Sequence, residues 1–120
     1  MAERLWEIHR NLSDLIRALR PDAIAVEELY FSSNVSTAIT VGQARGVILL
    51  AAAQALVDVH EYAPNQVKQA LTGYGSADKR QMQDMLTLLL ELDEAPRPDD
   101  ASDAVATALC HLQTARFARL

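Results

Sequence analysis

The sequence has one cysteine, Cys110, among its 120 residues, so it cannot form a disulfide bond within the chain. A lone cysteine fits a reducing compartment, and we therefore expect a cytoplasmic location. The most apolar run, Val47 to Val57, is about half of the ~20 residues that a membrane-spanning helix needs. No basic segment followed by an apolar one stands at the start, so neither a membrane partner nor a secretory signal is expected.

The sequence also lacks signals that are typical of several functional classes. His9, His60 and His111 have no metal-ligand spacing, which argues against a zinc site. The segment from Gly73 to Lys79 does not match a Walker A motif, which argues against nucleotide binding. The net charge is −5, whereas nucleic-acid-binding domains are usually basic. This charge counts against a DNA substrate without excluding one, because a local basic patch can still contact phosphate.

The apolar periodicity that is present predicts five helices and two strands in one small α/β domain. The predicted helices cover Arg4 to Leu19, a segment ending near Ala55, Pro64 to Gly73, Ala77 to Leu90, and a segment starting near Asp99. The run from Ala23 to Val26 predicts a strand buried on both faces, and a second strand is expected from Val57 to Tyr62. A long helix between two strands is typical of a right-handed parallel crossover. Two strands make a very small sheet, which indicates that further strands belong to this fold.

Single residues predict where helices begin and how one of them packs. Ser33, Asn34 and Ser36 are candidate N-caps of the second helix, and Ser76 is the expected cap of the fourth. Gly42 and Gly46 lie inside the second helix, where each costs roughly 1 kcal/mol relative to alanine. We therefore expect another backbone to pack closely against both glycines.

The first candidate for function is Glu27, which directly follows the predicted strand. Ligands of open parallel sheets bind beyond the carboxyl ends of the strands, so a carboxylate at this position is well placed to face a site. The alternative is that Glu27 and Glu28 begin a solvated loop.

Two further candidates, Asp100 and Asp103, share one face at the start of the last helix. A pair of carboxylates can hold a hard divalent cation such as Mg²⁺. The alternative is helix capping, for which Asp99 and Asp100 suffice. Asp103 precedes residues 104–106, which are expected to be buried, so we expect it to need a partner or a metal.

Several motifs along the chain form one set when they are taken together. They are Ala25-Val26-Glu27-Glu28-Leu29-Tyr30, Val41-Gly42-Gln43-Ala44-Arg45-Gly46-Val47, Gln66-Val67-Lys68-Gln69, Gly73-Tyr74-Gly75-Ser76-Ala77-Asp78-Lys79 and Asp100-Ala101-Ser102-Asp103-Ala104-Val105-Ala106. This set resembles one family, the RuvC Holliday junction resolvases. The motifs occur in the family's order and at about its spacing, and they cover nearly the whole chain.

This resemblance implies an RNase H-like fold, a homodimer, and symmetric cutting of four-way DNA junctions with Mg²⁺ or Mn²⁺ in recombination and repair. It also implies branch-migration machinery as a partner. The implied metal ligands are Glu27, Asp100 and Asp103, and Lys68 and Lys79 are expected near the scissile phosphate. Tyr30 stands where the family usually has a phenylalanine that stacks on a base, and Arg80 is an expected DNA contact.

The sequence departs from the family in one respect. The family begins with a strand reading roughly Gly-Ile-Asp-Pro-Gly, whose aspartate is a fourth metal ligand, and these 120 residues contain no such segment. We therefore expect residues 1–120 to form one nuclease domain without its N-terminal strands, with slow or absent cleavage by this chain alone. The alternatives are a junction-binding or dimerisation module without turnover, and a related nuclease acting on RNA or another branched substrate.

Overall fold

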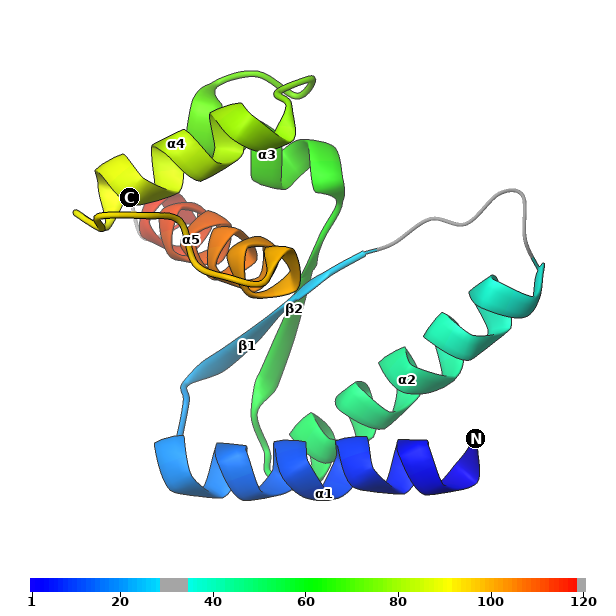
Figure 1. Cartoon of the computed structure of the whole chain (residues 1–120). Coiled ribbons are helices and arrows are strands. Elements are labelled where there is room, and N and C mark those ends of the chain that lie inside the picture. Colours follow the sequence, from blue (N-terminus) through cyan, green and yellow to red (C-terminus); the bar gives the residue numbers. More distant parts are fainter. Residues whose placement is uncertain (29–34, 119–120) are drawn as a thin grey trace. The chain divides into compact units, whose positions relative to one another are not determined.

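The computed structural model describes residues 1–28 and 35–118 and contains five helices and two strands (Figure 1). The elements in chain order are α1 (Ala2–Leu19), β1 (Ala23–Glu27), α2 (Val35–Gln54), β2 (Asp58–Tyr62), α3 (Pro64–Thr72), α4 (Lys79–Leu89) and α5 (Asp99–Ala118). The predicted α/β class and the predicted order of elements are confirmed.

The described residues form two compact units, residues 1–24 with 35–59 and residues 25–28 with 60–118. The strands β1 and β2 form a two-stranded parallel sheet (Figure 1). At its carboxyl end, the amide of Glu28 donates a hydrogen bond of 2.7 Å to the carbonyl of Tyr62. All five residues of β1 are half-buried, so the expected burial on both faces is wrong. Within the described residues β1 pairs with β2 alone, which leaves it less enclosed than a central strand.

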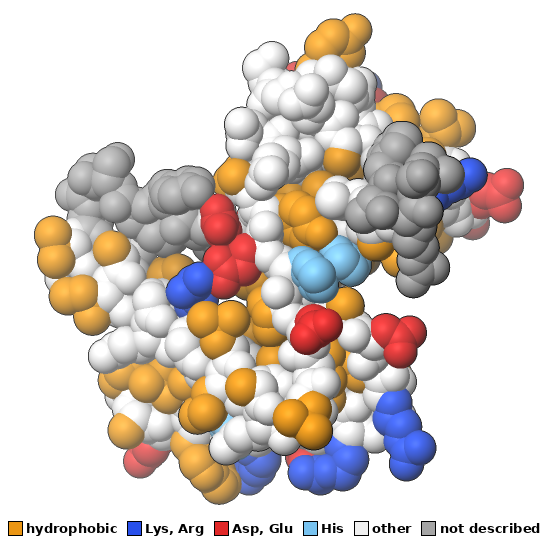
Figure 2. Space-filling model, turned by 180° about the vertical axis from the view of Figure 1, so that it is seen from behind, with side chains coloured by type: hydrophobic (Ala, Val, Ile, Leu, Met, Phe, Trp, Pro, Cys, Tyr) orange, Lys and Arg blue, Asp and Glu red, His pale blue; other side chains and the backbone are white. Residues whose placement is uncertain are grey.

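The first unit is held together by α1 and α2, which pack against each other. The residues Ile16, Ala51 and Ala52 are buried, and Nε2 of His9 lies 2.6 Å from Oε1 of Gln54. Several large apolar side chains of these helices are exposed, and Figure 2 shows hydrophobic side chains at the surface on one face of the molecule. They are Trp6, Leu15, Leu19, Val35, Ile39 and Leu50.

The interior glycines of α2 do not mark a close contact. Among the described residues, apart from the adjoining residues and backbone of α2 itself, no atom lies within 4 Å of the position that a Cβ would take at Gly42 or Gly46. The expectation of a closely packed backbone there is wrong. Of the candidate caps, Ser33 and Asn34 lie outside the described residues, and Ser36 is the second residue of α2.

Helix α2 is, among the described residues, the one helix long and apolar enough to cross a membrane by length and composition. One such helix indicates a membrane span only weakly, because core helices of soluble proteins pass the same test. Within its own unit α2 packs along α1.

The second unit packs α3, α4 and α5 around one hydrophobic core. Helix α3 begins at Pro64, whose missing amide hydrogen costs nothing in the first turn, and it ends at Gly73 with a left-handed φ of 84°. The N-cap of α4 is Asp78, whose carboxylate accepts a bond of 2.8 Å from the amide of Gln81, so the prediction of Ser76 is wrong. The buried core residues are Tyr62, Val67, Leu71, Leu86, Ala106 and Cys110.

Candidate functional site

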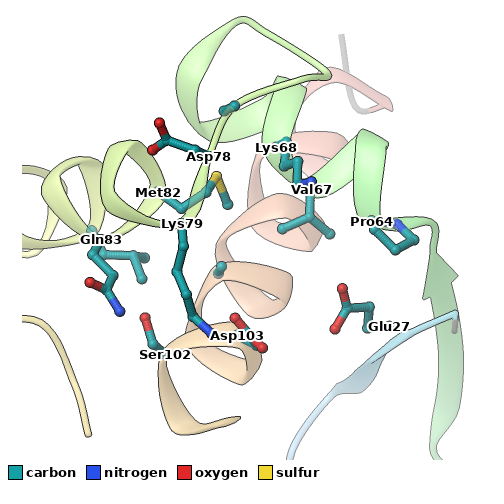
Figure 3. Close-up of a pocket in the computed structure, with 13 residues that line it drawn as sticks. Glu27, Pro64, Val67, Lys68, Asp78, Lys79, Met82, Gln83, Ser102 and Asp103 are labelled. Atoms are coloured by element: carbon teal, nitrogen blue, oxygen red, sulfur yellow. The ribbon is translucent and has the colours of Figure 1, made fainter. Parts of the chain in front are cut away.

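A pocket of about 280 Å³ opens in the second unit where four elements meet (Figure 3). The end of β1 provides Glu27, α3 provides Lys68, the start of α4 provides Lys79, and the first turns of α5 provide Asp103. Glu27, the two lysines and Asp103 come from three segments that lie far apart in the sequence. The fold therefore brings both acidic and basic groups to the carboxyl end of a parallel strand, where ligands of such sheets bind.

The carboxylate of Glu27 is half-buried and shares the pocket with Asp103 (Figure 3). Its pKa is raised above the ordinary value, first because burial disfavours the charged form and second because of the negative charge of Asp103. The positive charge of Lys68 partly offsets both effects. These three side chains are therefore close enough to act on one another electrostatically.

Lys68 and Lys79 are the only two lysines of the chain, and both line this pocket. All other basic side chains except the histidines are arginines. Lysine carries a compact charge on a flexible stem and often binds phosphate as a point charge. The restriction of lysine to this one pocket is a feature that composition alone does not reveal.

Lys79 is paired with an acidic residue that sequence reasoning assigned to helix capping. The Nζ of Lys79 lies 2.9 Å from Oδ2 of Asp99, the first residue of α5. The Nε2 of Gln83 donates a bond of 3.4 Å to the other carboxylate oxygen of Asp99. The hydrogen bond to Asp99 raises the pKa of Lys79, and the charges of Asp103 and Asp100 add to this effect.

The two aspartates of α5 occupy different positions relative to the pocket. Asp103 lines it, whereas Asp100 is not among the lining residues. Both are exposed, so burial does not require a partner or a metal for Asp103, contrary to expectation. Its neighbour Ala104 is exposed and Val105 is half-buried, while Ala106 is buried as expected. Within the described residues, no group of three or more acidic, histidine or cysteine side chains has the arrangement of a metal site.

The remaining predicted residues, Arg80 and Tyr30, do not line this pocket or lie outside the residues that the structure describes. Arg80 is exposed on α4 and is not a lining residue. Tyr30 lies outside the described residues. Sequence reasoning missed Gln83 and the buried Ser102, which line the pocket, and the contact of Asp99 with Lys79. No spacing rule links residues 79 and 99, so only the folded chain reveals that pair.

The donor set of the pocket suits one type of chemistry. Carboxylate oxygens such as those of Glu27 and Asp103 are the ligands that hard divalent cations prefer. Lysine ammonium groups beside them are suited to hold a phosphate oxygen. Acidic and basic groups together at one pocket are the arrangement expected in metal-dependent enzymes that act on phosphate esters.

Comparisons with known proteins identify the family within this class. Residues 1–111 match the family model of crossover junction endodeoxyribonuclease RuvC. The RuvC protein of Chloroflexus aurantiacus is 62% identical over 113 residues, which are 94% of this chain and 69% of that protein. The RuvC protein of Roseiflexus is 59% identical over 118 residues, which are 98% of this chain and 70% of that protein. The chain belongs to the RuvC family, whose members are metal-dependent nucleases.

Solved structures agree with this assignment. The structure of Thermus thermophilus RuvC superposes with a TM-score of 0.90 at 44% identity, over 97% of this chain and 70% of that one. RuvC from the same organism in complex with Holliday junction substrate superposes with a TM-score of 0.92, at the same identity and coverage. The predicted RNase H-like fold and the predicted family are therefore confirmed.

Proposed function

We propose that this chain acts as a Holliday junction resolvase, a structure-selective endonuclease that cuts four-way DNA junctions by metal-dependent phosphodiester hydrolysis. The observation that carries the proposal is the meeting of Glu27, Asp103 and both lysines at one pocket. A relative of matching fold that was solved with Holliday junction substrate supports the choice of DNA substrate. On this proposal, the two compact units belong to one nuclease domain over residues 1–120.

Each site residue has a role that its chemistry supports. Glu27 and Asp103 bind Mg²⁺ or Mn²⁺ through their carboxylates, and Asp100 joins them from the same first turns of α5. The chemistry that a bound cation supplies is the activation of water and the stabilisation of charge on the phosphate. Lys68 and Lys79 hold the scissile phosphate. Tyr30 stacks on a base and Arg80 contacts the DNA backbone.

A second candidate function is junction binding without efficient turnover. The observation that favours it is that three carboxylates line the pocket among the described residues, and one of them, Asp78, caps α4. This leaves Glu27 and Asp103 as the lining carboxylates that can act as cation ligands. Two carboxylates hold a divalent cation weakly, since such ions are usually bound by more oxygen ligands. By family resemblance a further ligand is expected, because the family carries an aspartate in a Gly-Ile-Asp-Pro-Gly segment that these 120 residues do not contain. On this proposal the chain alone binds junctions and cuts them slowly.

The experiment is metal-dependent cleavage of a synthetic four-way junction in Mn²⁺. We compare the chain alone with the same chain joined to a RuvC first strand that carries its aspartate. The joined chain is expected to cut faster, and Glu27→Gln or Asp103→Asn is expected to reduce its rate 100-fold or more, on the order of 3 kcal/mol of lost stabilisation. Asp84→Asn serves as the matched control, because Asp84 is exposed on α4 outside the pocket. Unchanged rates for the Glu27 and Asp103 variants would refute the nuclease site.

The assembly and the location of the protein follow from the same proposal. We infer a homodimer, because symmetric cutting of two strands requires two copies of the site. Branch-migration machinery is the further partner that fits a junction substrate, and the cytoplasm is the compartment where DNA is accessible. Light scattering on the chain with and without junction DNA tests the dimer, and a one-to-one complex of chain and junction would contradict it.

A further inference from the structure

Lys79 and Gln83 lie one helical turn apart on α4 and both contact Asp99 at the start of α5. The amine of Lys79 lies 2.9 Å from one carboxylate oxygen of Asp99, and the amide of Gln83 lies 3.4 Å from the other. Residues four apart on a helix share a face, so α4 presents both donors to the same carboxylate. Two donors of α4 thus contact the carboxylate of Asp99.

We propose that Asp99 is a positioning residue that holds the amine of Lys79 in the absence of DNA and is displaced by a phosphate of the bound junction. The inference rests on the proposed function, in which Lys79 contacts phosphate. The inference adds Asp99, which does not line the pocket, as a residue that sets how strongly Lys79 binds the DNA phosphate.

A carboxylate and a phosphate are both anions that bind the amine of Lys79 in the same way. A carboxylate oxygen at 2.9 Å from Nζ is at the distance of a charge-assisted hydrogen bond, and a phosphate oxygen forms a bond of the same kind. The side chains of Lys79 and Asp99 are 56% and 64% exposed. Exposed ion pairs contribute little free energy, so an incoming phosphate can replace this one. The exchange transfers a hydrogen-bond partner and breaks no covalent bond.

A consequence follows for DNA affinity. The carboxylate of Asp99 takes up one of the three N–H donors of Lys79 and offsets its positive charge. Asp99 therefore weakens the contact between Lys79 and phosphate. The variant Asp99→Asn keeps the size of the side chain and a hydrogen-bond acceptor for Gln83, but it removes the charge. We expect this variant to bind a four-way junction roughly 2- to 5-fold more tightly than the unaltered chain, which is the range of an exposed ion pair.

The test is a set of dissociation constants for a synthetic four-way junction, measured across a range of salt without divalent cations. The variants are Asp99→Asn, Asp99→Glu, Lys79→Gln and the double variant of positions 79 and 99. Asp99→Glu keeps the charge and should bind as the unaltered chain does. Asp84→Asn removes an exposed carboxylate from α4, the helix of Lys79, without touching the pair, and it measures the general effect of one charge. Far-ultraviolet circular dichroism confirms that each variant is folded.

We expect Asp99→Asn to tighten binding more than Asp84→Asn does, and we expect this excess to vanish when Lys79 is glutamine. An equal effect of the two substitutions, or an excess that persists without Lys79, would overturn the role of Asp99. The proposed function has its own readout, because Lys79→Gln alone should weaken binding and lower the salt dependence by about one counterion. If Lys79→Gln weakens binding but Asp99→Asn does not tighten it, only the inference about Asp99 is wrong. If Lys79→Gln changes nothing, both are wrong.

Discussion

The hydroxyl oxygen of Tyr62 lies 2.5 Å from Nδ1 of His111, which stands 49 residues further along the chain. This contact joins the end of β2 to α5, and the ring of His60 lies against the same imidazole with centroids 4.4 Å apart. Burial lowers the pKa of His111, and the positive charge of a protonated His60 lowers it further.

A pH dependence of stability follows from this arrangement. A histidine whose pKa is lowered by folding binds protons more weakly in the folded chain than in the unfolded one, where the ordinary value is 6.5. Its contribution is therefore fully present above that value and is lost as the pH falls from there to the lower folded pKa. We expect the free energy of unfolding in urea to decrease between about pH 7.5 and 5.5.

The variant His111→Gln isolates this contribution. At the higher pH it should lower the free energy of unfolding by about 1 kcal/mol relative to the unaltered chain, because the bond to Tyr62 is lost. As the pH falls, the free energy of unfolding of this variant should decrease less than that of the unaltered chain. If the free energy of unfolding falls equally with pH in the unaltered chain and in His111→Gln, a group other than His111 is responsible.

The N-cap of α4 gives a second prediction. Asp78→Ala removes the carboxylate that accepts the amide of Gln81, so it should lower the free energy of unfolding by about 1 kcal/mol. Ser76→Ala is the matched control, because Ser76 is exposed and lies outside the cap. Urea unfolding of both variants decides between the two positions, and a larger loss for Ser76→Ala would contradict the structure.

Leu56 gives a third prediction, in the direction of greater stability. It has a left-handed φ of 58° after the end of α2, and its side chain is 93% exposed. A non-glycine residue in this conformation is strained by about 1 kcal/mol, and an exposed leucine gains no burial in return. Leu56→Gly should therefore raise the midpoint of thermal unfolding, whereas Leu56→Ala should not. No difference between the two variants would show that the strain is relieved in another way.

The lysine of α3 gives a fourth prediction, for DNA binding. Lys68→Gln should weaken binding of a four-way junction and reduce the slope of log affinity against log salt by about one. Arg116→Gln is the control, because Arg116 is an exposed residue of α5 that does not line the pocket. Filter binding at several salt concentrations measures both, and an equal change in slope for the two variants would exclude a specific phosphate contact of Lys68.

Much of the fold could be predicted from the sequence because the local signals agree. Pro64 and Gly73 bound α3 as expected, since each residue suits one end of a helix. The cap of α4 was harder, because Ser76 and Asp78 are both good caps and lie two residues apart. The glutamine three residues after Asp78 is the signal that distinguishes them, since it completes a capping box.

The orientation of α5 could not be read from its residues. Alanine occupies several faces of this helix, so the sequence offers little contrast between buried and exposed sides. The buried positions Ser102, Ala106 and Cys110 follow one another at intervals of four, and they place Asp103 next to the core stripe rather than in it. The position of Asp103 at the pocket depends on how α5 packs in its unit, and this is a property of the folded chain.

Because both lysines lie in one pocket, a label on lysine amines reports on this site. Reagents that modify primary amines have two side-chain targets in this protein, Lys68 and Lys79, and the α-amino group as a third. Reductive methylation with a carbon-13 label would therefore give a spectrum in which two of three labelled amines are those expected to touch the substrate, without any substitution in the chain.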